Sequence, residues 1–212
     1  MSDAVPAWPM NDRLQGWTAR RRFLSLIGLG GIAALGHAPF DAYYLSFPAF
    51  ALAFALLAVQ PTLKQAFWGG WALAFGNFVI GWNWLVEPFL VDPATVWMAP
   101  FGVTLLAGAM AFYWAVATLL AHLVKTRLAP TRTAHLLLIA ALLTLAEYCR
   151  GYWFTGFPWG MVAYVWIETP LAQLLAFIGP HGLNLLTWLA AITLSGWLLT
   201  GRGVRGSVGV RR

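Results

Sequence analysis

The hydrophobic positions of this chain fall into long runs, and its polar residues, prolines and glycines lie mostly between those runs. Such runs predict membrane-spanning helices, each of which needs roughly 20 residues to cross a bilayer. The six predicted spans are residues 23–40, 43–59, 66–86, 96–124, 134–148 and 183–199. The third and fourth are long enough to cross unaided, whereas the first and fifth are marginal.

Composition supports this class of protein. Of the 212 residues, 60% are hydrophobic and 9% are charged, whereas soluble domains carry roughly 25% charged residues. So few charges could not cover a surface that faces water. The sequence therefore predicts an all-α polytopic membrane protein with about six transmembrane helices and an outer-face interfacial segment.

The distribution of charge predicts the orientation. The net charge of +6 would suggest a nucleic-acid partner for a soluble protein, but no nucleic acid is expected here. With the N-terminus in the cytoplasm, every Lys and Arg except Arg150 falls on the inner side, as the positive-inside rule requires. Both termini are thus predicted to be cytoplasmic. The chain divides into a basic tail (1–22), a transmembrane domain (23–199) and a second basic tail (200–212).

Residues 157–178 are apolar enough to form a seventh span. Such a span would put the arginine-rich C-terminal tail outside, and it would place Glu168 near its centre. A charge at mid-membrane costs about 2.5–3.5 kcal/mol. We therefore expect a segment at the outer membrane interface that carries a short amphipathic helix, and the seventh span remains the alternative.

Few side chains inside the predicted spans can ionise, and no motif has metal-ligand or phosphate-loop spacing. Ion-coupled transport therefore has little support, and no metal or cofactor is expected. His122 and His135 lie near the inner ends of their helices, where interfacial water explains them without a function. The nearby Glu147 and a helix C-terminus both disfavour a thiolate at Cys149, so we interpret Cys149 as a packed small residue.

Polar residues collect on the predicted outer side. After the third span, Asn83 lies between two tryptophans, one of them Trp84, and Glu87 precedes a proline. The stretch EYCRGYWFTGFPWG, which begins at Glu147, follows the fifth span. Tryptophans at such positions usually form an interfacial belt. Their crowding beside Asn83, Glu87, Glu147 and Arg150 favours a second hypothesis, a lipid-facing site.

Glu147 and Arg150 are three residues apart, hence on one helix face, where they can pair. The pair would hold the helix end in place, which is our main interpretation. Its guanidinium could also hold a phosphate or a lipid headgroup. Gly151, Gly156 and Pro158 then end the helix and let the backbone turn along the membrane surface.

The same stretch carries the pattern E-x-x-R-G-x-x-x-T-G-F-P-W, formed by Glu147, Arg150, Gly151, Thr155, Gly156, Phe157, Pro158 and Trp159. This pattern resembles the membrane part of bacterial apolipoprotein N-acyltransferases. Supporting matches are the turn Pro39-Phe40-Asp41, the tryptophan segment at residues 81–84, and Gly179, Asn184 and Leu186. The similarity extends from about residue 20 to residue 199.

The resemblance implies the last step of lipoprotein maturation at the periplasmic face of the bacterial inner membrane. Enzymes of this family transfer an acyl chain from a phospholipid to the α-amino group of a diacylglyceryl-modified N-terminal cysteine. The transfer passes through a thioester on the cysteine of a Glu-Lys-Cys set, which lies in a nitrilase-like periplasmic domain. The implied partners are the phospholipid acyl donor, the diacylglyceryl apolipoprotein and the bilayer. In the family the nitrilase-like domain follows one more membrane span of the same chain, so for this chain a separately encoded domain is a further expected partner.

The sequence offers no segment for that domain, so we expect the membrane portion of a truncated or split enzyme. No catalytic residue and no acyl transfer by this chain alone are predicted. The alternative is a non-catalytic membrane scaffold or lipid-binding protein. The residues predicted to bind the lipid substrates are Asn83, Trp84, Glu87, Glu147, Arg150, Thr155, Gly156, Phe157, Pro158 and Trp159.

Overall fold

The computed structural model describes residues 13–128, 131–154 and 156–200, and these residues form helices and turns without a strand. The six long helices are α2 (Ala19–Ala34), α3 (Tyr43–Ala58), α4 (Leu63–Gly81), α6 (Ala99–Leu128), α7 (Arg132–Tyr152) and α8 (Leu175–Thr200). The shorter elements are η1 (Asn83–Val86), α5 (Glu87–Leu90), η2 (Val96–Met98), η3 (Val162–Trp166) and η4 (Pro170–Leu174).

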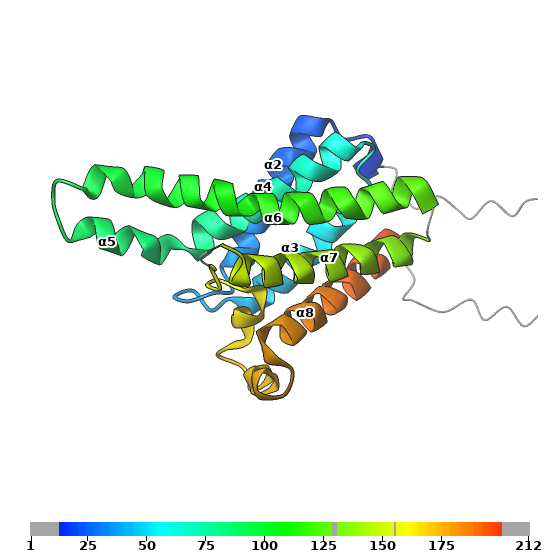
Figure 1. Ribbon diagram of the computed structural model, residues 1–212. Helices are drawn as coiled ribbons and strands as arrows, with labels where there is room; N and C mark the ends of the chain where they lie inside the picture. The colour runs from blue at the N-terminus through cyan, green and yellow to red at the C-terminus, as the bar shows by residue number, and fades with distance from the viewer. Residues whose placement is uncertain (1–12, 129–130, 155, 201–212) are drawn as a thin grey trace, which may run out of the picture.

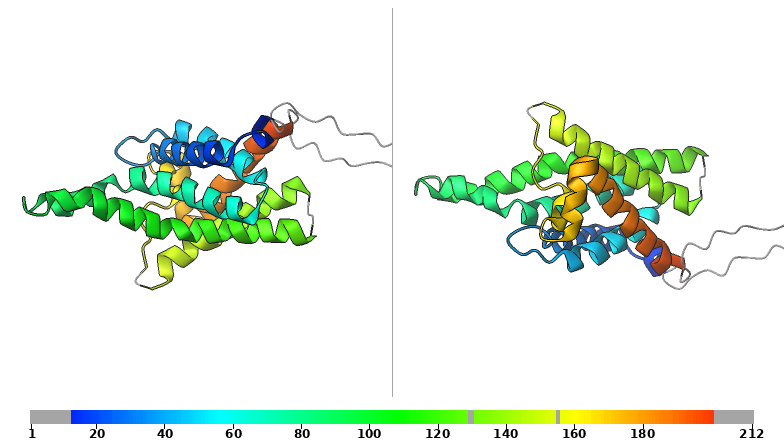
Figure 2. Two further views of the ribbon diagram at one scale, coloured as in Figure 1. Left: turned by 90° about the horizontal axis from the view of Figure 1, so that it is seen from above. Right: turned by 90° about the horizontal axis from the view of Figure 1, so that it is seen from below.

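The long helices pack in a closed ring. Helix α4 contacts α2 and α6, α7 contacts α6 and α8, and α3 closes the ring between α8 and α2. Figures 1 and 2 show these helices from three sides. The start of α6 and the segment that contains α5 extend beyond the other helices as an arm (Figure 1).

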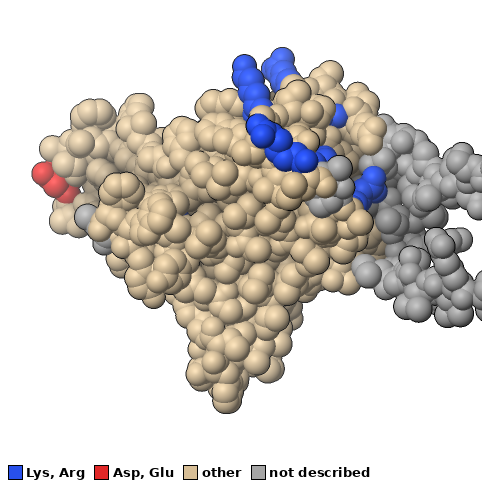
Figure 3. All heavy atoms as spheres, turned by 45° about the vertical axis from the view of Figure 1, so that its right-hand side comes forward, with Lys and Arg blue, Asp and Glu red and all other residues tan. Residues whose placement is uncertain are grey.

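We call the end of the bundle where α7 ends the outer end, and the end where α6 ends and α7 begins the inner end, after the predicted orientation. On the face shown in Figure 3, Lys and Arg side chains gather toward one end, and Asp and Glu side chains lie at the opposite tip. This separation agrees with the predicted distribution of charge.

Threonine caps begin three of the long helices. The hydroxyls of Thr18, Thr62 and Thr131 each accept a hydrogen bond from a backbone N–H of the first turn of α2, α4 and α7. Such caps satisfy one of the N–H groups that a helix start leaves without a partner.

Glycines bring α2, α4 and α6 close together. A Cβ atom at Gly30 would meet the backbone of Leu73, and one at Gly76 would meet the backbone of Ile27, so α2 and α4 touch through both glycines. A Cβ atom at Gly70 would likewise collide with Thr118 of α6. Small residues at such crossings are typical of helix packing in membranes.

Aromatic side chains fill the centre of the ring. Phe78 stacks on Trp82 with a centroid distance of 4.2 Å and meets Trp114 edge-on at 5.3 Å. Trp114 in turn meets Trp188 at 5.4 Å, and Trp188 meets Phe50 at 4.8 Å. These contacts join α4, α6, α8 and α3, and all five side chains are fully buried.

Three helical stretches among the described residues are long and apolar enough to cross a membrane: Val96–Leu128, Arg132–Tyr152 and Pro170–Trp197. Tyr43–Ala58 is apolar but shorter. The third predicted span is not among the three, although we expected it to cross unaided. The fifth is among them because α7 extends to 21 residues. The all-α membrane fold is confirmed, and the count of six spans stays a prediction.

Several predicted boundaries differ from the structure. Helix α2 ends at Ala34, six residues before the predicted end, because the chain turns back and the Ala42 N–H bonds to the Leu35 carbonyl. Helix α4 ends at Gly81, and the tryptophan segment that follows forms η1. Helix α8 begins at Leu175, eight residues earlier than predicted, and its axis breaks at Gly179, where φ is 64°.

Residues 157–178 do not form one continuous helix. They contain η3, η4 and the first turn of α8, and the predicted amphipathic helix is replaced by these two short 3₁₀ segments. Asn184 of α8 accepts a hydrogen bond from the Ala163 N–H, which ties η3 to the bundle. A seventh helical span over these residues is therefore wrong, whereas their position at the outer interface stays a prediction.

Candidate functional site

The last turn of α7 buries two opposite charges. Glu147 and Arg150 are 0% and 1% exposed, respectively. The Arg150 Nη2 atom lies 2.7 Å from Glu147 Oε2 in an i,i+3 ion pair. The pairing predicted from their spacing is confirmed.

Trp114 of α6 completes the environment of the carboxylate. Its indole Nε1–H donates to Glu147 Oε1 at 2.7 Å, and Arg150 Nε donates to the same oxygen at 3.1 Å. Both carboxylate oxygens thus accept charge-assisted hydrogen bonds. A buried carboxylate is tolerated when its charge is paired and its oxygens are bonded in this way.

The guanidinium of Arg150 also holds the loop that follows α7. Its Nη1 atom donates to the carbonyl oxygens of Phe157 and Trp159. Four of its five N–H groups therefore have acceptors within the described residues, two on the carboxylate and two on the loop. The guanidinium also lies 5.3 Å from the Phe78 ring centroid. Arg150 thus fixes the loop to the helix end, the structural role expected for the pair.

Positive backbone angles let this loop turn tightly. Helix α7 ends at Tyr152, and Phe154, Gly156 and Gly160 have φ of 55°, 71° and 65°. The Phe157 N–H bonds back to the Arg150 carbonyl at 2.8 Å. A Cβ atom at Gly156 would collide with the carbonyl of Gly151, so this position requires glycine. Thr155 lies outside the described residues.

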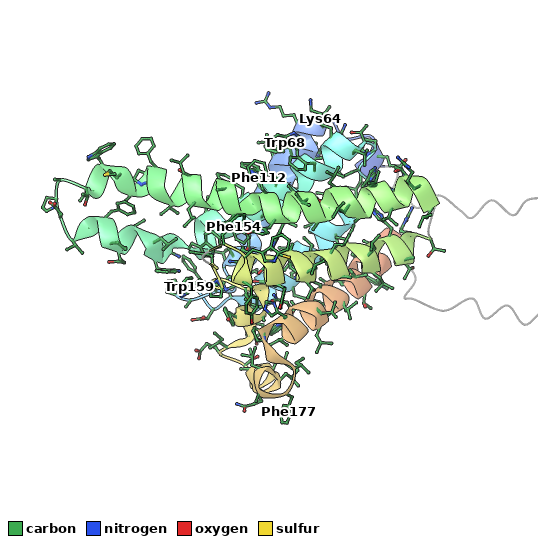
Figure 4. All side chains as sticks on the ribbon, viewed as in Figure 1. Lys64, Trp68, Phe112, Phe154, Trp159 and Phe177 are labelled. Carbon is green, nitrogen blue, oxygen red and sulfur yellow. The ribbon has the colours of Figure 1, made fainter. Side chains whose placement is uncertain are left out.

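Exposed aromatic rings surround the loop, and we call Trp84, Trp153, Phe154 and Trp159 the aromatic lip. Each of the four is more than a third exposed, and Trp159 is 52% exposed. Trp84 and Trp159 come from distant parts of the sequence, and their ring centroids are 6.4 Å apart. Phe154 and Trp159 are labelled in Figure 4. Phe157 instead packs inward, 4.6 Å from the Trp82 centroid.

The other predicted site residues lie outside the buried hydrogen-bond network. Asn83 donates its amide to the Ile80 carbonyl at 2.9 Å and so closes the end of α4. Glu87 is exposed in the first turn of α5. Pro158 lies between Phe157 and Trp159, whose carbonyls bond Arg150. The structure thus brings Glu147, Arg150 and residues 156–159 together, with Trp84 beside them.

Comparison with known proteins decides the family. Residues 29–193 match the family described as the apolipoprotein N-acyltransferase N-terminal domain. The chain belongs to this family. The resemblance inferred from the TGFPW stretch is confirmed.

Curated relatives are named apolipoprotein N-acyltransferase. The apolipoprotein N-acyltransferase of Caulobacter vibrioides is 36% identical over 191 residues, which cover 88% of this chain and 35% of the relative. That of Rhodopseudomonas palustris is 34% identical over 178 residues, with coverages of 81% and 32%. That of Chromobacterium violaceum is 33% identical over 184 residues, with coverages of 85% and 34%. The chain spans about a third of the length of these curated relatives.

This member of the apolipoprotein N-acyltransferase N-terminal domain family contains two site residues that the sequence alone did not reveal. Trp114 lies in the middle of a predicted span, and the only sequence signal is that a buried indole N–H usually finds an acceptor. His37 lies in the turn between α2 and α3, where it is buried and its Nε2 atom has no hydrogen-bond partner. Burial lowers the pKa of His37 to about 4, against a smaller effect of the nearby Glu147 carboxylate that raises it.

Cys149 occupies an apolar setting in this family member. It is buried, and it lines a groove of about 470 Å³ between α6 and α7 together with Phe112 and Phe154. Figure 4 labels the two phenylalanines. Lys64 and Lys125, the two lysines of the chain, lie at the start of α4 and in the last turn of α6, toward the inner end. The thiol and the two amines therefore do not meet, and Cys149 packs as predicted.

Proposed function

We propose that this chain is the membrane portion of an apolipoprotein N-acyltransferase system. It would bind the phospholipid acyl donor and the diacylglyceryl apolipoprotein at the outer end of the bundle. One observation carries the proposal: exposed aromatic side chains surround a loop that a buried ion pair holds to the end of α7. Amphipathic aromatic side chains favour the membrane interface, which is where both lipid substrates present their headgroups.

The predicted site residues divide into two roles in this proposal. Trp84 and Trp159 contact the substrates, and Pro158 shapes the surface between them. Glu147, Arg150, Gly156 and Phe157 position that surface, because their polar atoms or their rings face the protein. Asn83 and Glu87 would lie at its edge, and Thr155 belongs to the same loop.

Acyl transfer itself would need a further domain. A thioester requires a thiolate that is activated by a neighbouring base or cation. Cys149 lines an apolar groove whose lining contains neither lysine. We therefore propose that a separately encoded nitrilase-like domain supplies the Glu-Lys-Cys set. The outer end would face the periplasm in the bacterial inner membrane, and both termini would face the cytoplasm.

The proposal can be tested by direct binding of a diacylglyceryl peptide to the purified chain in nanodiscs. The double variant Trp84→Ala/Trp159→Ala should weaken binding roughly tenfold, since large aromatic anchors dominate binding energies. Trp197→Ala is the matched control, because Trp197 is also 52% exposed but lies near the C-terminal end of α8. Equal losses in both variants would contradict a site at the lip.

A second assay distinguishes the proposed function from a scaffold. The chain is mixed with diacylglyceryl peptide and phospholipid, with and without a purified periplasmic nitrilase-like domain, and N-acylation is followed by mass spectrometry. Product is expected only in the presence of that domain. Product from the chain alone would overturn the proposed division of labour, and binding without any product in either mixture would favour the non-catalytic lipid-binding alternative.

A further inference from the structure

The inner end of the bundle contains a pocket of about 640 Å³ between α2, α3, α6 and α7. Its lining is rich in basic side chains, which come from α2, α6 and α7. The polar residues that line it include Arg22, Gln60, His122, Lys125, Arg132 and His135. None of the described Asp and Glu residues lines this pocket.

Arg22 is buried in the wall of this pocket, and no carboxylate among the described residues pairs with it. Its side chain is 4% exposed. It donates to the backbone carbonyls of Leu14 and Gln15 and to the side-chain oxygen of Gln65. All three acceptors are neutral, so they satisfy hydrogen bonds but do not compensate the charge. A buried charge that is not paired is costly.

Lys125 adds a second cation, and its partner among the described residues is again a neutral group. Its Nζ atom donates to the carbonyl of Ala58, the last residue of α3, at 2.9 Å. The C-terminus of a helix attracts a cation, which explains why Lys125 points inward rather than into solvent. Arg132, the first residue of α7, brings a third cation to the same lining.

Two buried histidines complete the lining. The sequence suggested that interfacial water solvates His122 and His135, but the structure shows that they are 3% and 2% exposed. That interpretation was wrong, because α6 and α7 pack their imidazoles against each other with a centroid distance of 6.1 Å. The Nδ1 atom of His122 and the Nε2 atom of His135 have no hydrogen-bond partner in the part of the chain that the structure describes. Buried polar atoms without partners are rare in native proteins.

A ligand that carries negative charge and several acceptor oxygens would satisfy all of these groups together. We propose that this pocket binds the phosphate group of an anionic phospholipid of the inner leaflet. Basic pockets between helices on the cytoplasmic side are typical sites for anionic headgroups. The site lies at the opposite end of the bundle from the aromatic lip, so it is independent of the function proposed for the outer end.

The position of the pocket favours a ligand that comes from the membrane. A second hollow of about 440 Å³ shares Arg22 and Gln60 with the pocket and continues along the bundle to Trp68. Lys64 and Trp68 are labelled on α4 in Figure 4. A headgroup held at the pocket would therefore have apolar surface beside it for the acyl chains, which free phosphate does not require.

Native mass spectrometry of the purified chain provides the test. The chain is titrated with short-chain phosphatidylglycerol, with phosphatidylcholine of the same chain length, and with inorganic phosphate. Phosphatidylglycerol should bind at least fivefold more tightly than phosphatidylcholine, since a basic residue contributes about this factor toward an anionic lipid. Tighter binding of phosphatidylglycerol than of inorganic phosphate would support the lipid source. Equal or tighter binding of inorganic phosphate would overturn that source and leave a soluble phosphate ester as the ligand.

Three variants localise the binding. Lys125→Gln removes one cation from the pocket, and it should weaken phosphatidylglycerol binding about fivefold. Arg127→Gln is the matched control, because Arg127 is exposed two residues further along α6 and does not line the pocket. Lys125→Arg keeps the charge and should restore binding, which separates an effect on binding from a failure to fold. The proposal is overturned if the two lipids bind alike or if Arg127→Gln weakens binding as much as Lys125→Gln does.

Discussion

At the outer end, Arg150 lies against the carboxylate of Glu147, whose second oxygen also accepts the Trp114 indole N–H. At the inner end, Arg22 is buried almost as deeply, and its acceptors among the described residues are neutral oxygens. Within the part of the chain that the structure describes, one buried arginine is thus paired with a carboxylate and the other is not. The difference suggests that the outer cluster needs no ligand to be stable, whereas the inner pocket gains stability when an anion enters.

Unbonded polar atoms do not separate the two ends in the same way. Both oxygens of Glu147 and four donors of Arg150 are bonded, but His37 Nε2 and Trp82 Nε1 beside this ion pair have no partner among the described residues. The inner pocket likewise contains two imidazole nitrogens without partners. The ends therefore differ in how their buried charges are paired. The outer end combines a neutralised ion pair with exposed aromatic rings, and the inner end contains cations without a carboxylate among the described residues.

The strongest test of this comparison removes each arginine in turn. Arg150→Met leaves Glu147 buried without its counter-charge, so it should lower the free energy of unfolding by about 3–5 kcal/mol. Arg22→Met also loses hydrogen bonds, but it leaves no opposite charge behind and should cost only about 1–2 kcal/mol. Unfolding in mixed detergent micelles, followed by circular dichroism, measures both values.

A double variant serves as the control for this test. Glu147→Gln/Arg150→Met removes both charges, so it should be more stable than Arg150→Met alone. If the two arginine variants lose equal stability, or if the double variant gains nothing over the single one, the ion pair is not what distinguishes the outer end.

Acid should weaken the outer end through His37. The folded protein lowers the pKa of His37 from 6.5 to about 4, mainly through burial. Between these pH values the unfolded chain binds more protons than the folded one. Above about pH 6.5, His37 therefore has no effect on the free energy of unfolding. As the pH falls from 6.5 toward 4, His37 lowers that free energy, and below about pH 4 it lowers it no further. The full loss corresponds to about 3 kcal/mol.

Unfolding measured in the same micelles from pH 7.5 to pH 4 checks this prediction, at roughly half-unit steps. His37→Gln carries a neutral side chain at every pH, so this variant should lack the His37 part of the pH dependence. A slope that is unchanged in His37→Gln would show that another group is responsible.

The sequence predicted the features that depend on local spacing. The i,i+3 pairing of Glu147 with Arg150, the turn at Gly156 and the burial of Cys149 follow from neighbours on one helix or turn, although α7 continues through Gly151, where the sequence predicted its end. The family followed from a local motif of the same stretch. The all-α fold followed from apolar runs, because helices are the way in which such segments satisfy their backbone in a membrane.

Features that depend on contacts between distant segments were missed. Trp114 is 33 residues from Glu147 in the sequence, and no spacing rule connects them. His122 and His135 were expected to be solvated because they lie near helix ends, but the packing of α6 against α7 buries both. Some helices also end at other residues than the apolar runs predicted. Helix α2, for example, ends at Ala34 because the following turn is held by its own backbone hydrogen bonds, which hydropathy does not reveal.

The smallest effect concerns two tryptophans that pack against each other in the core. Trp114 and Trp188 are both fully buried, but Trp114 Nε1 donates to Glu147 and Trp188 Nε1 has no partner. Replacement by Phe removes similar ring volume from each, so the packing losses should be comparable. Trp114→Phe should therefore cost about 2 kcal/mol more than Trp188→Phe, the contribution of a hydrogen bond to a charged group. Equal melting temperatures for the two variants would mean that the indole does not stabilise the carboxylate. If the two substitutions cost the same stability in a Glu147→Gln background, the additional loss in Trp114→Phe comes from the hydrogen bond to the buried carboxylate at the outer end.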